Sequence, residues 1–290
     1  MILSKVARQK DMITPGAETR QYVRNRSSRG GSGSGLAIPT KTRITERDEP
    51  NGRPFLFEVF MYKYDVVYIL KQYSQPDELR YSLRSICENM EFNRVWFYCG
   101  KPAGLKPDVY VPKAQTGANK WEKVRSSLID ICKNDDITKR FWLFNDDFYI
   151  LKPYHRMKPY HVGELRDHIN RVEARHNGRT PYTMQLRECE YQLKKAGLTT
   201  LDYAIHVPLL IERDKMLEAL KAFPSVPMFR SVYGNYANIG GTQREDVKIN
   251  KPGTAVDPKL DLLSSSDKSI HGEVGRFLAE RFPNKCRYEL

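Results

Sequence analysis

Apolar residues recur in two alternating periods over the first half of the chain. Four short apolar runs have the length of buried strands and lie at 66–70, 95–99, 108–111 and 141–144. Apolar residues at helical spacing separate them, first over 75–90, where Ser74 is a candidate helix cap, and then over 121–132. Strands that alternate with helices at this pace predict an α/β fold with a parallel, doubly wound central sheet.

The second half of the chain is less regular. Helical spacing predicts helices over 163–176, 185–196 and 213–222, and a final amphipathic helix carries apolar residues from Val274 to Phe282. Residues 230–262 are rich in Gly, Asn and Pro, a composition typical of loops. The sequence contains no internal repeat, no P-loop and no GxGxxG motif.

The composition predicts that residues 1–54 form a disordered, basic tail and that residues 55–290 form a single domain. The tract 24–35 consists of Arg, Asn, Ser and Gly, which cannot bury apolar surface. Residues 1–50 hold ten basic and five acidic residues. We expect this tail to be dispensable for folding, either as a solvated leader or as an arm that binds nucleic acid or a partner.

Composition narrows the class of protein. Of 290 residues, 40% are hydrophobic and 11% aromatic, which is enough to build a core. The 48 Lys and Arg residues outnumber 35 Asp and Glu, and the net charge of +13 favours polyanionic partners such as nucleic acid, anionic membranes or phosphorylated substrates. Five scattered cysteines without ligand spacing indicate reduced thiols in a cytoplasmic protein. No apolar run has the roughly 18 residues that a membrane span needs.

The sharpest chemical signal is a pair of adjacent acids, Asp146 and Asp147, after the apolar run 141–144. Ligands of open α/β sheets bind beyond the carboxyl ends of the strands. Two adjacent carboxylates repel each other unless a cation or a proton lies between them. The pair therefore predicts a Mg²⁺ or Mn²⁺ site shared with a substrate diphosphate, and the alternative is an ordinary turn.

Three further residues are candidates, each with a structural alternative. His206 lies in the segment Ile205–Pro208 and suits a general base or a metal ligand, or else a core histidine. Arg230 suits a phosphate contact or a surface ion pair. Asp267 precedes a predicted helix and suits a catalytic acid or a helix cap.

Several segments form a recognisable series when they are taken in order. They are Glu78–Ile86, Arg94–Tyr98, Asn119–Glu122, Phe144–Asp147, His206–Pro208 with Ile211–Arg213, Arg230, and Asp267 with Phe282–Pro283 and Tyr288–Glu289. This series resembles the Stealth family, which includes bacterial capsule hexose-1-phosphate transferases and the N-acetylglucosamine-1-phosphotransferase that tags lysosomal enzymes. The resemblance covers about residues 62–290. It departs at 70–73, where Leu-Lys-Gln-Tyr replaces the Val-Asp-Gly-Ser-Asp stretch with which family members help to hold the nucleotide.

The resemblance implies a GT-A-like, Rossmann-type fold, with a mostly parallel sheet flanked by helices, and a metal-dependent nucleotide-sugar transferase. Asp146 and Asp147 would hold the divalent cation on the donor diphosphate, and Arg230 would neutralise phosphate charge. His206 would deprotonate or position the acceptor hydroxyl, and Asp267 would orient His206 or the acceptor. Catalytic roles thus fall to His206, Asp267 and Asp147, and substrate binding is expected of Arg80, Arg84, Asn119, Glu122, Asn145 and Arg230.

Two questions stay open at this level. The group transferred is a sugar-1-phosphate if the attack falls on phosphorus, or a sugar if it falls on the anomeric carbon. The acceptor is expected to be a glycan, with a modified DNA base or a protein as alternatives, and the basic tail adds nucleic acid as a partner. The rival class is a non-enzymatic nucleic-acid-binding protein.

Overall fold

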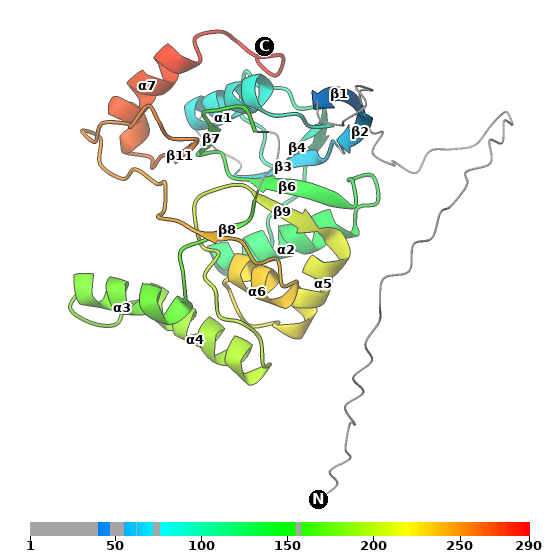
Figure 1. Cartoon of the computed structure of the whole chain (residues 1–290). Helices are drawn as coiled ribbons and strands as arrows, with labels where there is room; N and C mark the ends of the chain where they lie inside the picture. The colour runs from blue at the N-terminus through cyan, green and yellow to red at the C-terminus, as the bar shows by residue number, and fades with distance from the viewer. Residues whose placement is uncertain (1–39, 47–54, 62, 72–75, 155–157) are drawn as a thin grey trace, which may run out of the picture. The chain divides into compact units, whose positions relative to one another are not determined.

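The computed structural model describes residues 40–46, 55–61, 63–71, 76–154 and 158–290 (Figure 1). Its centre is a five-stranded sheet in the order β5-β4-β3-β6-β9. The strands are β3 (Asp65–Leu70), β4 (Val95–Cys99), β5 (Val109–Val111), β6 (Arg140–Phe144) and β9 (Leu209–Glu212). The first four strands pair in parallel, and β9 pairs antiparallel with β6. The predicted α/β class with a mostly parallel central sheet is therefore confirmed.

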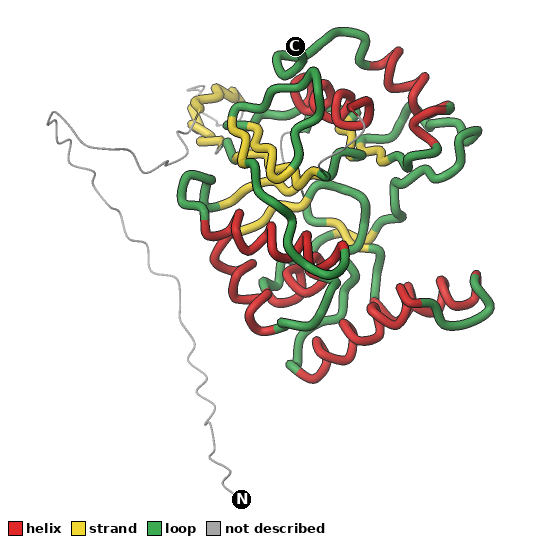
Figure 2. Tube along the Cα trace, turned by 180° about the vertical axis from the view of Figure 1, so that it is seen from behind, coloured by secondary structure: helices red, strands yellow, loops and turns green. Residues whose placement is uncertain are grey.

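Alternate residues of the central strand β3 face two different helical layers. Tyr68 packs in one core cluster with Leu83 of α1 (Pro76–Asn89). Val67 packs in another cluster with Leu128, and the helices on that face are α2 (Lys120–Lys133), α5 (Arg213–Ala222) and α6 (Phe229–Tyr236). This follows from the two-residue period of a strand. In Figures 1 and 2, α1 lies on one side of the sheet and α2, α5 and α6 gather on the other.

The remaining elements extend this framework. Helices α3 (Leu165–Arg175) and α4 (Pro181–Lys195) pack against each other (Figure 1). Strand β7 (Phe148–Ile150) pairs antiparallel with β11 (Leu262–Ser264), and β8 (Tyr160–His161) pairs parallel with β10 (Thr242–Gln243). A 3₁₀ turn at Ser269–His271 precedes α7 (Glu273–Arg281). In the described part of the chain, no helix is long and apolar enough to span a membrane.

One segment of the expected tail forms a strand in the structure. Strand β1 (Thr40–Glu46) pairs antiparallel with β2 (Phe55–Met61), and Ile44 lies opposite Phe57. β-Branched residues alternate with charged ones in β1, which is typical of a strand rather than a solvated tail. Residues 1–39 and 47–54 of the expected tail lie outside the described residues, and so does the candidate cap Ser74.

The sequence predicted loops from residue 230 onward, but the structure has helix α6 at the start of this segment. It contains Gly234, a residue that weakens isolated helices. Here the glycine allows close packing, because a Cβ atom at this position would lie 2.3 Å from the ring of Tyr203. Tertiary contact thus outweighs the low helix propensity of the glycine.

Candidate functional site

The two predicted acids lie at the end of β6, in the connection to β7. Asp147 is buried, and its Oδ2 accepts hydrogen bonds from Lys248 Nζ at 2.8 Å and from Ser264 Oγ at 3.1 Å. Its Oδ1 is also buried, and no hydrogen-bond donor reaches it from the described residues. A buried carboxylate oxygen without a partner is costly, and a bound cation would satisfy it.

Asp146 adds a second carboxyl to the same place. Burial and the neighbouring charge of Asp147 raise the pKa of Asp146 to about 6, and Asp267 acts in the same direction while Lys71 opposes it. The described residues contain no preformed group of three or more His, Cys, Asp or Glu side chains that could hold a metal. Asp146 and Asp147 fit a hard cation whose remaining ligands are substrate or water oxygens, a common arrangement for Mg²⁺.

Glu78 is a site residue that our sequence analysis did not single out. It lies in the first turn of α1, is buried, and accepts a hydrogen bond from Ser265 Oγ at 2.6 Å. Burial raises the pKa of Glu78 to about 7, and the charges of Asp146, Asp147 and Asp267 add to the effect. We call Glu78, Asp146, Asp147 and Asp267 the acid cluster. The available signal was an acid placed just before the apolar positions of the helix 75–90.

His206 is held by a different carboxylate from the one expected. Its Nδ1 lies 2.6 Å from Asp246 Oδ2, and its backbone N–H donates to Asp246 Oδ1 at 3.1 Å. Burial alone would raise the pKa of Asp246, but the hydrogen bonds and charge of His206 outweigh it and hold that pKa below its usual value. Asp246 therefore orients His206, whereas Asp267 is the exposed member of the acid cluster.

Arg230 and His206 both contact the ring of Phe148, the residue that follows Asp147. Its Nε donates to the carbonyl oxygen of Tyr203 at 3.0 Å, and its Cζ lies 5.9 Å from the centre of the Phe148 ring. The ring of His206 meets the same phenyl ring edge-on, with the centroids 6.4 Å apart. Burial lowers the pKa of Arg230 to about 10, and the charges of Asp246 and Asp147 oppose the shift. Because Phe148 directly follows Asp147, the structure gathers these groups at one place.

Arg80 and Arg84 lie on α1, and both bind the C-terminal segment of the chain. Arg84 forms two hydrogen bonds of 2.7 Å with the carboxylate of Glu289 and a third with the carbonyl oxygen of Phe282. Arg80 pairs with Glu289 at 3.2 Å and with Asp77 at 2.9 Å. In the structure these guanidinium groups tie α1 to the C-terminal segment, so a protein carboxylate occupies the side chains that were expected to bind substrate.

Asn119 and Glu122 form the N-terminal cap of α2. Asn119 Oδ1 accepts from the backbone N–H groups of Trp121 and Glu122, both at 3.0 Å, and Glu122 Oε2 accepts from the N–H of Ala118 at 2.8 Å. These bonds satisfy amides that a helix start leaves unpaired. Asn145, the last of the predicted substrate-binding residues, is exposed beside the acid pair.

Replacing Arg84 with methionine is expected to destabilise the protein, because the buried Glu289 carboxylate then keeps only its ion pair with Arg80 and a hydrogen bond from the N–H of Cys286 among the described residues. Breaking a largely buried ion pair costs about 3 kcal/mol, which lowers the thermal midpoint of a chain of this size by about 6–12 °C. Lys139→Met is the control, since it removes an exposed pair with Asp214. Calorimetry that finds an unchanged midpoint for Arg84→Met, together with weaker donor binding, would restore the substrate-binding role.

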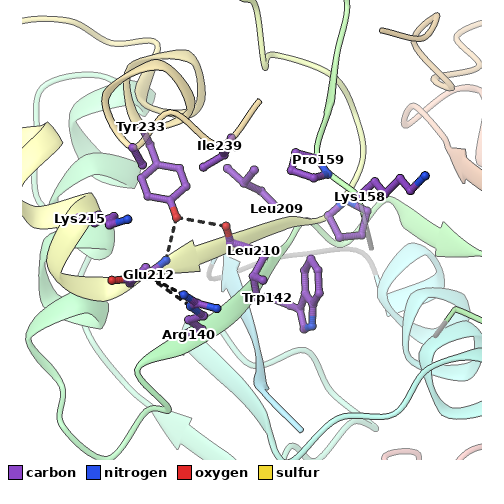
Figure 3. A pocket seen from close by; sticks show the side chains of 12 residues that line it. Arg140, Trp142, Lys158, Pro159, Leu209, Leu210, Glu212, Lys215, Tyr233 and Ile239 are labelled. Atoms are coloured by element: carbon purple, nitrogen blue, oxygen red, sulfur yellow. Dashed lines mark hydrogen bonds and ion pairs between the residues drawn. The ribbon is translucent and has the colours of Figure 1, made fainter. Parts of the chain in front are cut away.

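Two cavities flank the candidate site. The larger, of about 840 Å³, lies between α3 and the segment 243–250 and includes Asp246 and Lys248. The smaller, of about 300 Å³, lies along the outer strand β9 and includes Pro208 (Figure 3). In the smaller cavity the Tyr233 hydroxyl accepts from the N–H of Glu212 at 2.9 Å and donates to the carbonyl oxygen of Leu210. The larger cavity contains Asp246, which binds His206, and Lys248, which binds Asp147.

Comparison of the sequence with models of known protein families finds no match, and comparison with curated proteins finds none either. The geometry of the site, together with the motif resemblance, is therefore the basis of the functional assignment.

Proposed function

We propose that this protein is a metal-dependent transferase that moves a sugar-1-phosphate, or a sugar, from a nucleotide-sugar donor onto an acceptor hydroxyl. The observation that carries the proposal is the convergence around Phe148 of three groups: an acid pair with an unpartnered oxygen, the His206–Asp246 pair, and the guanidinium of Arg230. The position of the acid pair, directly after a central strand, also supports a GT-A-like fold.

Asp146 and Asp147 are the residues that would hold Mg²⁺ or Mn²⁺. When bound there, the cation would neutralise the charge that develops on the donor diphosphate. Lys248 already contributes one positive charge at Asp147 Oδ2, and Arg230 contributes a second within electrostatic range of Asp147. Fixed cations in a partly buried site stabilise such charge more strongly than water does.

His206 would act as the general base. The Asp246 carboxylate accepts the Nδ1–H, which leaves the lone pair on Nε2 for the acceptor proton. If the acceptor oxygen bonds to the sugar-bearing phosphorus of the donor, the P–O bond to the nucleoside monophosphate breaks. If it bonds to the anomeric carbon, the C–O bond to the nucleoside diphosphate breaks. In both cases the leaving group keeps the electron pair. The proton passes to Nε2, and Asp246 stabilises the resulting imidazolium.

The choice between the two transferred groups rests on the resemblance. The Stealth family includes hexose-1-phosphate transferases, which favours attack on phosphorus, and its members act on glycans or glycoproteins. The rival class, a non-enzymatic nucleic-acid-binding protein, does not account for the buried carboxyls of Glu78 and Asp147 beside an oriented histidine.

A thermal-shift screen of nucleotide sugars, with and without Mn²⁺, tests the proposal. We expect at least one nucleotide sugar to raise the thermal midpoint only when Mn²⁺ or Mg²⁺ is present, since the cation bridges the diphosphate and the acid pair. That nucleotide sugar should then be consumed slowly by water or faster by an acceptor. A panel in which no donor gives a metal-dependent shift and none is consumed would refute the proposal.

A further inference from the structure

A basic groove lies beside the candidate site. It is the cavity of about 840 Å³ between α3 and the segment 243–250. Four cationic side chains line it, against two carboxylates, and they are Arg171, Arg175, Arg244 and Lys248. The proposed function does not use the two arginines of α3.

The cations of the groove differ in how far the protein already neutralises them. Lys248 pairs with Asp147, and Arg244 pairs with Asp261 at 3.0 Å. Arg171 contacts only a backbone carbonyl oxygen, that of Val162 at 3.4 Å, and Arg175 has no ion-pair partner among the described residues. Both arginines are exposed. Their charges are therefore available to a ligand.

The acids of the groove offset these charges only in part. Asp246 is engaged by His206, and Glu245 is exposed. The remaining titratable group, His168, pairs with the buried carboxylate of Asp202. The wall formed by α3 therefore presents uncompensated positive charge toward the cavity.

The groove adjoins the reacting groups through two of its lining residues. Asp246 holds His206, and Lys248 holds Asp147. A chain bound along α3 would therefore lie against the residues that hold the base and the acid pair. This position suits an acceptor rather than an effector.

We infer that the groove binds a single strand of nucleic acid, whose phosphates contact Arg171 and Arg175 and whose hydroxyl group is the acceptor of the transferase. The inference rests on the proposed function for the acceptor role, but not for binding. Arg171 and Arg175 are one helical turn apart, so that each can reach a different phosphate. Arginine binds phosphate in a bidentate manner and stacks on bases. A saccharide has no base on which a guanidinium can stack. The net charge of +13 favours the same class of ligand.

Fluorescence anisotropy with a labelled single-stranded DNA of about a dozen nucleotides, a length within the usual site size, tests the binding. The full chain is titrated at several salt concentrations, without donor or metal. The test variant is Arg171→Gln/Arg175→Gln. The matched control, Lys215→Gln/Lys221→Gln, removes the same charge from exposed positions of α5.

Loss of two phosphate contacts should reduce the slope of log affinity against log salt by about 1.4, and weaken binding about tenfold or more near 0.1 M salt. The control should keep the slope of the unaltered protein. Equal slopes for the two variants would assign the binding to other basic segments and overturn the inference. So would failure of the unaltered chain to bind the oligonucleotide while a phosphodiester-linked glycan binds in an Arg171- and Arg175-dependent manner.

The two proposals fail in different ways. Oligonucleotide binding that depends on the α3 arginines, without any metal-dependent donor turnover, would support the groove and refute the transferase. Donor turnover that continues in Arg171→Gln/Arg175→Gln, but no longer reaches a hydroxylated oligonucleotide acceptor, would support both.

Discussion

Asp147→Asn is expected to abolish transfer and to remove the metal-dependent stabilisation by donor. The substitution keeps the size of the side chain but removes the charge that would hold the cation. It also weakens the bond to Lys248. A metal site contributes several kcal/mol of transition-state stabilisation, so turnover should fall by about 1,000-fold or more. Donor consumption measured with saturating Mn²⁺ gives the rate, and a thermal-shift titration with Mn²⁺ and donor gives the loss of stabilisation.

Asp261→Asn is the matched control for this experiment. Asp261 is also a carboxylate paired with a cation, Arg244, but it contributes no carboxyl to the acid cluster. Its replacement should leave the metal-dependent shift in place. Undiminished turnover of Asp147→Asn in the presence of a chelator would show that no metal acts at this position.

His206→Ala is expected to lower kcat far more than donor affinity. The base acts on the acceptor proton, so its loss removes general-base catalysis worth about 100- to 10,000-fold and leaves the donor contacts intact. Arg230→Ala should instead weaken both donor binding and turnover, because its charge lies near the phosphates in the ground state and in the transition state. Steady-state kinetics with varied donor separate the two effects.

Asp246→Asn tests whether the carboxylate acts through the histidine. The neutral amide no longer fixes the tautomer of His206 or stabilises the imidazolium that forms on it during transfer, so turnover should fall while donor binding is kept. The maximal kcat should fall about tenfold or more, with donor KM unchanged. His176→Ala, at an exposed position after α3, should change neither value. A maximal kcat of Asp246→Asn equal to that of the unaltered protein would contradict the positioning role.

Local sequence predicted those parts of the site that are contiguous in the chain. Asp146 and Asp147 directly follow a buried apolar run, so the end of a strand and an acid pair could be expected together. The role of Asp246 could not be predicted, because this residue lies 40 residues from His206 in a segment whose composition indicates only loops. Glu78 and Ser265 are 187 residues apart, and they meet because α1 packs against β7 and β7 pairs with β11.

The fold shows the same division. Alternation of short apolar runs and helical spacing predicted the parallel strands and their helices, since both periods are local. It did not predict β9, whose four residues take their antiparallel direction from pairing with β6. Helix α6 was missed because Gly234, which lowers helix propensity, is required there by the ring of Tyr203.

The hydroxyl of Tyr233 has a consequence for the behaviour of the protein at high concentration. Strand β9 ends the central sheet, and the free side of such a strand is a template on which another chain can add. By bonding both the N–H of Glu212 and the carbonyl oxygen of Leu210, the tyrosine occupies two of the positions that an added strand would need (Figure 3). The side chain of Tyr233 from α6 thus opposes pairing between the β9 edges of two molecules, the first step of edge-to-edge aggregation.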